Sequence, residues 1–386
     1  MNLRGLRCRM TPVRREMGIL ALHLEVAHEC IKLKKHLITA SYVSQEMYRL
    51  GDEARDRQLI FMGEMGLDPG IDHMSAMKHI NDIKAEGGNI QAFRSYTGGL
   101  IAPEYDTNPW NYKFTWNPRN IVLAGQGTAQ YLQDGKFKYI PYHRLFSECR
   151  AVDIPDVGEF EVYPNRDSLL YREVYGLEGI PNIIRGTLRH KGFCEAWHAL
   201  VQIGLTDAAY PIVDSGKLTY HELMDAYVSP DTPGTSVKER IANLIGVDAN
   251  SPVIRKLEWL GLFRKKRIHL ENATPALILE ELLLDKWKLK RGDRDLIIMH
   301  HEFEYELKGK KHMDTSTLVM KGEDDVNTAM AKLVGLPTGI FVKLVMQGKI
   351  KSKGVQIPVS PEVYEPVLKE LKDYGVEFKE HETVLN

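Results

Sequence analysis

The sequence lacks several features that would place it in other protein classes. Its four cysteines form no C-x-x-C pair, so a zinc-binding or redox motif has no support. The formal net charge is -1, without the basic excess typical of nucleic-acid-binding proteins. No apolar run approaches the roughly 20 residues that span a bilayer. We therefore expect no metal ion, no nucleic-acid partner and no membrane span, and the scattered thiols favour the cytoplasm.

The composition is close to that of an average globular protein. The hydrophobic fraction is 43% and the charged fraction is 27%, so large cores can form. At about 100–200 residues per domain, the length predicts two or three domains. The first fifteen residues are basic and contain no long apolar run, so they do not predict a signal peptide.

The segment from Leu20 to Met62 alternates between helical and strand patterns. A helix is expected from Leu20, because Leu22, Val26, Cys30 and Leu33 recur at spacings of three and four. The following segments are an apolar strand at His36–Tyr42, a helix at Gln45–Arg57 and a strand at Gln58–Met62. Short alternation of this kind is typical of a parallel α/β layer.

The rest of the chain divides into a β-rich part and a helical part. A helix capped by Asp72 and a strand at Asn89–Tyr96 lead into residues 97–185, which are rich in turns, prolines and short strands. Helical periods then recur at Ala196–Ile203, Tyr220–Ala226, Val237–Leu244, Ile254–Trp259 and Ala276–Leu284. The last expected elements are strands at Asp295–Glu304 and Thr315–Lys321, helices on both sides of Gly335–Pro337, a helix from Pro361 and a strand at Val376–Phe378.

The segment Gly63–His73 carries the strongest chemical signal. It joins a strand end, a tight turn and a helix start, and ligands of open α/β sheets bind beyond the carboxyl ends of strands. Backbone N–H groups at a helix N-terminus also stabilise anions. Without further information, a capped helix with a polar loop explains the same residues. A ligand-binding loop and a purely structural turn therefore both stay open at this point.

Several strings resemble, in order, the saccharopine dehydrogenases that release glutamate. They are Leu37–Ser44, Gly66–His73, Ser95–Leu100 with Ala102–Glu104, Asn108–Pro109, Tyr112–Trp116, Tyr163–Ser168, Arg185–Arg189, Ala329–Lys332 and Val334–Pro337. The resemblance covers roughly residues 20–375. It implies an oxidoreductase of lysine metabolism that uses NAD or NADP. Such an enzyme cleaves saccharopine to glutamate and aminoadipate semialdehyde, or catalyses the reverse reaction.

The resemblance also implies a substrate site. Saccharopine carries three carboxylates, and arginine supplies bidentate donors for such groups. The matching substrate-binding positions are Ser41, Tyr42, Asp68, Arg166, Thr187, Leu188 and Arg189. Asp68 and Tyr42 match catalytic positions, where they would position the substrate and hydrogen-bond its amine. We expect Asp68, Arg166 and Arg189 to surround one pocket.

The resemblance assigns cofactor contacts as well. The matching positions are Leu67, Asp68, Pro69, Gly70, Ile71, Thr97, Gly98, Gly99 and Asn117. Many relatives have cysteine where this chain has Thr97, so a thiol role does not carry over. Relatives are commonly homodimers, and the resemblance implies the same here.

A dinucleotide fold should begin with a strand, a G-x-G-x-x-G loop and a helix. The nearest string, Gly125–Gln130, lacks the third glycine and is not interpreted as that loop. We therefore expect an N-terminally truncated domain that binds NAD(P) weakly or not at all. The alternatives are a catalytically silent relative acting as a dimerising or carboxylate-binding module, and a sister enzyme such as carboxynorspermidine dehydrogenase.

The predicted fold is α/β with three parts. Residues 1–70, with a C-terminal return at 322–386, form the remnant of a Rossmann-type parallel sheet and a partial dinucleotide-binding domain. Residues 71–185 and 291–321 form a mixed α/β substrate and dimerisation domain. Residues 186–290 form an all-helical domain.

Overall fold

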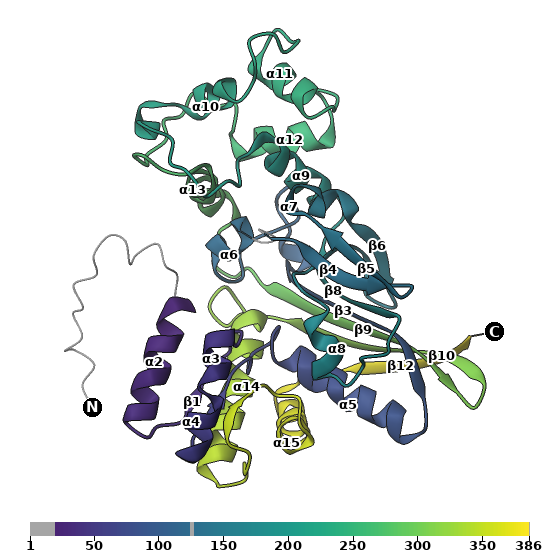
Figure 1. Cartoon of the computed structure of the whole chain (residues 1–386). Coiled ribbons are helices and arrows are strands. Elements are labelled where there is room, and N and C mark those ends of the chain that lie inside the picture. The colour runs from purple at the N-terminus through teal and green to yellow at the C-terminus, as the bar shows by residue number, and fades with distance from the viewer. Residues whose placement is uncertain (1–19, 124–126, 386) are drawn as a thin grey trace. The chain divides into compact units, whose positions relative to one another are not determined.

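The chain forms two compact units (Figure 1). The computed structural model describes residues 20–123 and 127–385. The first unit runs to His79 and includes Leu333–Gly375, and the second contains Ile80–Lys332 and the segment from Val376. The opening residues and Gly125 and Gln126 of the glycine-rich string lie outside the described residues. The three-part domain division stays a prediction.

A short parallel sheet organises the first unit. Among the described residues its strand order is β1 (Leu37–Ile38), β2 (Ile60–Met62) and β11 (Gly354–Gln356). Every residue of the central strand β2 is buried, which suits an apolar parallel strand. The helical segments are α2 (Leu20–Lys32), α3 (Gln45–Arg49), α4 (Gly51–Asp56), the start of α5 (Ile71–Ala85), most of α14 (Ala329–Met346), α15 (Pro361–Leu371) and η5 (Lys372–Tyr374). The expected parallel layer is confirmed.

The buried face of α2 is not the one that carries Leu22 and Val26. Ala27 and Ile31 are buried, whereas Leu22 and Val26 are 41% and 47% exposed. Both sets follow the helical period, so periodicity could not decide which stripe faces the core. Ala27 and Ile31 pack in one cluster with Met47, Leu59 and Phe61.

A mixed sheet dominates the second unit. Its described strands run in the order β12 (Lys379–Leu385), β10 (Lys310–Lys321), β9 (Asp295–Leu307), β3 (Asn89–Ile101), β8 (Asn182–Arg189), β4 (Ala129–Gln133) and β5 (Lys136–Ile140). The β7 strand (Gly158–Pro164) also pairs with β8, and β6 (Arg150–Ile154) pairs with β7. Strands β3 and β8 are parallel, and their neighbours in the sheet are antiparallel.

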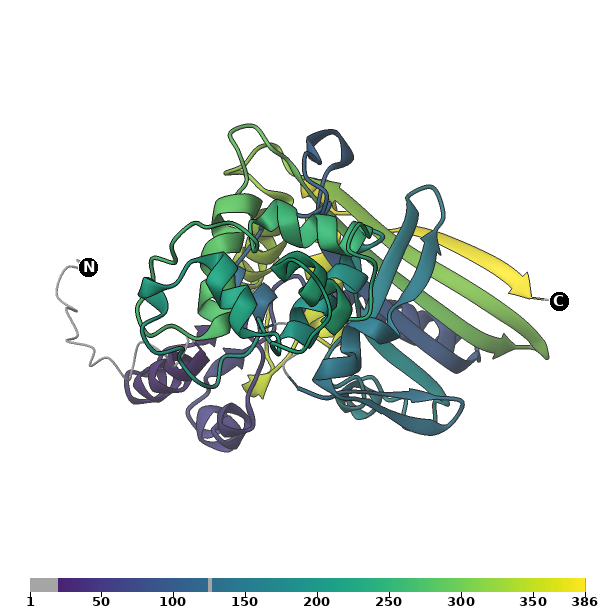
Figure 2. The same ribbon diagram turned by 90° about the horizontal axis from the view of Figure 1, so that it is seen from above.

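The last strand, β12, forms one edge of this sheet and lies beside the long hairpin of β10 and β9 (Figure 2). A two-residue turn joins β9 to β10, and Lys308 and Gly309 both have positive φ, at 51° and 74°, as a type I′ turn requires. The expected final strand at 376–378 is wrong, because pairing with β10 begins at Lys379. Val376 is instead buried, and the Phe378 ring stacks on His301.

The helical segment of the second unit follows the sequence periods closely. Its helices are α9 (Phe193–Ile203), α10 (Tyr220–Ala226), α11 (Val237–Leu244), α12 (Pro252–Leu260) and α13 (Pro275–Trp287), with η4 (Ser215–Lys217) before α10. Shorter helical segments elsewhere are η2 (Pro103–Tyr105), α6 (Pro118–Val122), α7 (Tyr142–Leu145), η3 (Phe146–Glu148) and α8 (Leu170–Val174). Side chains of Ser236, Ser251 and Thr274 cap α11, α12 and α13, so local sequence sets these boundaries.

Helix α14 corrects another expectation. The sequence predicted a break at Gly335–Pro337, but one helix runs through Pro337. Proline lacks a backbone N–H and costs about 3 kcal/mol inside a helix, so packing must outweigh this cost. Ile340, Phe341 and Leu344 are buried along one face. Among the described residues α14 is the helix that by length and composition could also cross a membrane, although a core helix passes the same test.

Candidate active site

Two loops of the first unit meet beyond the carboxyl ends of β1 and β2. The loop after β1 contains Ser41 and Tyr42, and the loop after β2 contains Asp68. Backbone bonds join the loops, because Glu64 N–H donates to Ser41 O at 2.9 Å and Met65 N–H donates to Thr39 O at 3.0 Å. The structure therefore brings Ser41, Tyr42 and Leu67–Ile71 into one pair of connected loops.

Glycines make this close approach possible. A Cβ atom on Gly63 would lie 2.1 Å from Val43 Cγ2, and one on Gly66 would lie 2.9 Å from Ala40 Cβ. Gly70 has a φ of +148°, and its Cβ would lie 2.0 Å from Gly66 O. The peptide bond between Asp68 and Pro69 is cis. The three glycines therefore hold Asp68 in a turn that side chains at their positions would disrupt.

A buried Glu64–His73 pair supports the two loops. Glu64 Oε2 lies 2.8 Å from His73 Nε2, and Oε1 accepts a hydrogen bond from Val43 N–H at 3.0 Å. His73 is fully buried on α5, so removing the carboxylate would leave a buried polar ring without this partner. The pair connects the loop that carries Tyr42 to the helix that follows Asp68.

The N-terminus of α5 differs in detail from the prediction. Asp72 lies inside the first turn of α5, which begins at Ile71, so its expected role as N-cap is wrong. Its Oδ1 instead accepts a hydrogen bond from Gly70 N–H at 2.6 Å, because a carboxylate near helix N–H groups is favoured there. Asp68 is half-buried just before this helix start.

In the second unit, strand pairing brings distant predicted residues together. Thr97 on β3 is the register partner of Thr187 on β8, and Tyr163 on β7 is the next partner in that row. A Cβ on Gly98 would lie 2.8 Å from Leu188 Cβ, so β3 and β8 pack closely. Side chains alternate along a strand, so Thr187 and Arg189 share one face of β8. Residues 97–99 and 187–189 thus form a second group of predicted site residues.

Arg189 is the most unusual group of this set. Its guanidinium is buried and lies 5.1 Å from the Tyr112 ring centroid, 5.3 Å from Phe193 and 5.7 Å from Tyr163. Nη1 donates to Leu188 O at 2.8 Å and Nη2 donates to Tyr163 Oη at 3.3 Å. In the part of the chain that the structure describes, Nε has no hydrogen-bond partner and no carboxylate pairs with this cation.

The cage around Arg189 is apolar and neutral. Burial raises the pKa of Tyr112 to about 12, and it also raises the pKa of Tyr163. Neither phenol therefore ionises near neutral pH to balance the guanidinium. A buried cation without a counter-ion is costly, on the order of several kcal/mol, and an anionic ligand would offset that cost.

Arg166 and Asn117 lie in loops of the same unit. Arg166 is an exposed residue with a φ of 50°, and its carbonyl accepts a hydrogen bond from Gln130 N–H at 2.9 Å. Asn117 caps α6, because its Oδ1 accepts from Arg119 N–H at 3.1 Å. Their predicted roles in substrate and cofactor binding stay predictions.

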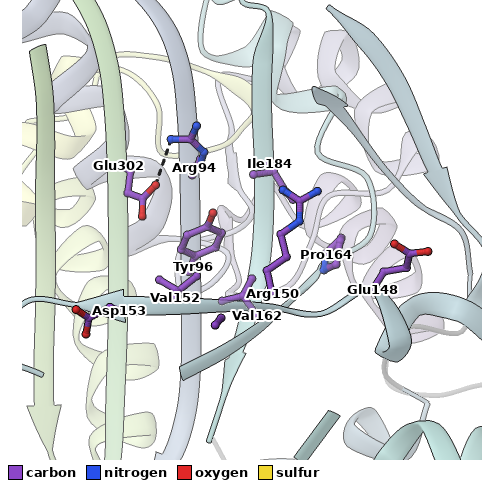
Figure 3. Close-up of a pocket in the computed structure, with 11 residues that line it drawn as sticks. Arg94, Tyr96, Glu148, Arg150, Val152, Asp153, Val162, Pro164, Ile184 and Glu302 are labelled. Atoms are coloured by element: carbon purple, nitrogen blue, oxygen red, sulfur yellow. Dashed lines mark hydrogen bonds and ion pairs between the residues drawn. The ribbon is translucent and has the colours of Figure 1, made fainter. Parts of the chain in front are cut away.

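A separate pocket of about 320 Å³ lies on the opposite face of the same strands (Figure 3). Arg94 and Tyr96 of β3, Ile184 of β8 and Glu302 of β9 line it, and Arg150 extends into it. Arg94 Nη1 lies 3.2 Å from Glu302 Oε2, so this arginine is already paired, unlike Arg189. Thr97, Thr187 and Arg189 are absent from its lining because they point to the other face.

The residues present fit a nicotinamide cofactor at its reactive end. The hydroxyls of Thr97 and Thr115 are buried and have no hydrogen-bond partner among the described residues. Such hydroxyls suit a carboxamide, whose amide and carbonyl groups can donate and accept hydrogen bonds. The described residues contain no G-x-G-x-x-G loop, so we assign no group to the pyrophosphate.

Sequence reasoning missed the supporting residues. His73 and Tyr163 lie in matching strings and Glu64 lies in the segment Gly63–His73, but the sequence assigned none of them a role. The nine-residue separation of Glu64 and His73 follows neither helix nor strand period, so no local signal reveals their pairing. The alternation of β7 could have placed Tyr163 on an inward face, although not beside Arg189.

These features define a class: a two-unit α/β protein with polar loops after parallel strand ends and a buried, unpaired arginine on a mixed sheet. The family model "Saccharopine dehydrogenase C-terminal domain" matches residues 66–376. The chain is 38% identical over 368 residues to saccharopine dehydrogenase [NADP(+), L-glutamate-forming] of Pyricularia oryzae, covering 93% of this chain and 81% of that protein. It is 36% identical over 382 residues to the alpha-aminoadipic semialdehyde synthase of Arabidopsis thaliana, covering 93% of this chain and 35% of that protein.

Solved structures agree with the sequence comparisons. The apo saccharopine dehydrogenase (L-Glu forming) of Saccharomyces cerevisiae has a TM-score of 0.84 at 34% identity, covering 95% of this chain and 84% of that one. A homospermidine synthase of Legionella pneumophila, solved with NAD, has a TM-score of 0.51 at 10% identity, covers 93% of this chain and 73% of that one, and supports the fold alone. The chain belongs to the saccharopine dehydrogenase family.

Proposed function

We propose that this chain oxidises the secondary amine saccharopine to glutamate and aminoadipate semialdehyde, or catalyses the reverse reaction. The buried Arg189 carries the proposal, because it is a cation in an apolar cage without a carboxylate partner among the described residues. A substrate carboxylate would supply the missing anion. The relatives from Pyricularia and yeast that share 38% and 35% identity are named for this activity.

Each predicted residue then has a chemical task. Arg189 binds one substrate carboxylate through its Nε and Nη groups, and Arg166 binds another. Thr187 and Leu188, on the same strand as Arg189, line the substrate site. Asp68 orients the substrate amine, and the Tyr42 hydroxyl and Ser41 hydrogen-bond to it.

The cofactor proposal rests on a second set of residues. A bound nicotinamide would accept the hydride from the amine carbon. Thr97, with its buried hydroxyl, would hold the carboxamide, and Gly98 and Gly99 would leave room beside it. We propose Leu67–Ile71 and Asn117 as further contacts. NADP is the proposed form, because the names of the Pyricularia and yeast relatives state NADP(+).

An amine-oxidation assay on the purified full chain tests this function. We expect saccharopine to yield reduced nicotinamide and glutamate, with NADP preferred to NAD, and carboxynorspermidine to be a poor substrate. Calorimetry of saccharopine binding, and fluorescence titration with NADPH and NADH, separate substrate binding from cofactor binding. A chain that neither turns over nor binds saccharopine would contradict the proposal.

A further inference from the structure

Two cysteines that are far apart in the sequence lie together in the second unit. Cys149 lies between η3 and β6, and Cys194 lies in the first turn of α9. Their sulfur atoms and a carboxylate oxygen of Glu161 on β7 all lie within 4.8 Å of one another. Both thiols are free. A separation of 45 positions hides this pair from any search for C-x-x-C spacing.

The two thiols differ in exposure. Cys194 is fully buried, whereas Cys149 is partly exposed. A hydrogen bond from the Cys194 thiol lowers the pKa of Cys149, although partial burial opposes this shift. The same hydrogen bond and burial raise the pKa of Cys194. The pair therefore combines a partly exposed cysteine whose pKa is lowered with a buried cysteine whose pKa is raised.

The surroundings favour thiol chemistry over metal binding. The Glu161 carboxylate already accepts hydrogen bonds from Gly192 N–H at 2.6 Å and Cys194 N–H at 3.0 Å. Arg189 and Lys256 both act on the Cys194 thiol electrostatically. These two cations near Cys194 disfavour a divalent ion there, whereas the negative charges of Glu161 and Glu195 oppose the lowering of the Cys149 pKa.

We propose that Cys149 and Cys194 are a reversible thiol-modification site that forms an intramolecular disulfide with hydrogen peroxide as oxidant. The Cys149 thiolate attacks one peroxide oxygen, the O–O bond breaks, and Cys149 becomes a sulfenic acid while hydroxide leaves. The Cys194 sulfur then attacks the Cys149 sulfur, and the S–O bond breaks as water leaves. In total, two thiols and one hydrogen peroxide give one disulfide and two waters.

The bond would join the loop before β6 to the first turn of α9. Phe193, next to Cys194, contributes a ring to the cage of Arg189. The crosslinked segment contains Arg166, Thr187 and Arg189. The disulfide would therefore restrain the segment that carries the predicted carboxylate-binding residues, although the proposal itself does not depend on the enzymatic activity.

Peptide mapping of the native full chain tests the proposal. The chain is treated with hydrogen peroxide, its remaining thiols are alkylated, and its proteolytic peptides are analysed by mass spectrometry. We expect a linked peptide pair containing Cys149 and Cys194, lighter by about 2 Da than the two reduced peptides and separated again by dithiothreitol. Cys149→Ser should abolish the linked pair, and the matched variant Cys30→Ser, at another half-buried thiol, should retain it.

Two outcomes would contradict the proposed disulfide. One is oxidation of Cys149 to a sulfinic acid while Cys194 stays alkylatable. Another is stoichiometric zinc in the purified chain that shields both thiols until a chelator removes it, because this would identify a metal site. The map of the unsubstituted chain decides the question even where Cys149→Ser fails to fold.

Discussion

The two units hold their predicted site residues by different means. In the first unit, Ser41, Tyr42 and Asp68 lie in two short loops joined by backbone bonds and spaced by glycines. In the second unit, Thr97 and Thr187 are brought together by the pairing of β3 with β8. The first arrangement depends on main-chain shape, whereas the second depends on which side chains occupy one face of a sheet.

This difference indicates where substitutions should act. A changed side chain in the sheet should remove binding and leave the fold intact. A changed glycine in the loops should destabilise the fold before it affects any contact with a ligand. Measuring stability and ligand binding on the same variants separates the two cases.

The largest effect is expected for Arg189→Met. Loss of the buried cation should weaken saccharopine binding several hundredfold, about 3–4 kcal/mol, because a substrate carboxylate loses its buried partner. The free energy of unfolding should stay unchanged or rise by roughly 1–3 kcal/mol, since an unpaired buried charge is replaced by an apolar chain of similar size. Calorimetry and denaturant titration measure the two quantities.

Arg150→Met is the matched control, because Arg150 lies on the opposite face in the 320 Å³ pocket. We expect saccharopine affinity within about twofold of the unsubstituted chain. Equal losses for both arginines would contradict the assignment of the substrate site to the face that carries Arg189.

A smaller effect, on stability, is expected for Gly70→Ala. The added Cβ would lie 2.0 Å from Gly66 O at a φ of +148°. We expect a loss of about 2–3 kcal/mol in the free energy of unfolding, measured by denaturant titration. Gly348→Ala, at a φ of +68° with nothing within 4 Å, is the control in the same unit and should cost about 1 kcal/mol. A loss no larger than that of the control would show that the loop can relax.

The smallest effect concerns the pocket face. Burial alone would raise the pKa of Glu302, but hydrogen bonds from His300 and Arg94 outweigh it and lower this pKa. The stabilisation is therefore present above the ordinary glutamate pKa of about 4.3 and is lost as the pH falls through the lower folded-state value. Glu302→Gln should cost about 1 kcal/mol at neutral pH and nothing in strong acid.

Denaturant titrations across pH check this prediction. The exposed Glu159→Gln serves as the control and should leave stability unchanged at every pH. A pH-independent cost for Glu302→Gln would mean that lost packing, rather than lost charge, explains the effect.

The elements that sequence reasoning predicted best are those fixed by nearby residues. Helices α10 and α11 match the predicted ranges because their periods and their caps, Thr219 and Ser236, are local. Helix α14 was missed as one element because packing overrides Pro337. The last strand was shifted because pairing with β10 begins only at Lys379.

The candidate site shows the same limit. Matching strings identified Asp68, Thr187 and Arg189 as candidates, but the isolation of Arg189 in an aromatic cage is a tertiary property. The Glu64–His73 pair and the Cys149–Cys194 pair join segments whose separations follow no secondary-structure period. The resemblance therefore identified the candidate residues, whereas their supporting contacts can be found only in the fold.

The alternation of β8 has a consequence for how this protein tolerates change. Arg189 and Thr187 face one side of the sheet, and Ile184 faces the pocket on the other side. The number of residues between them on β8 determines which face each side chain takes. Inserting or deleting a single residue between Ile184 and Thr187 would turn Thr187 and Arg189 to the pocket face while Ile184 kept its position. Point substitutions can modify one side at a time, whereas a change in the length of this strand would place the candidate binding residues on the wrong face.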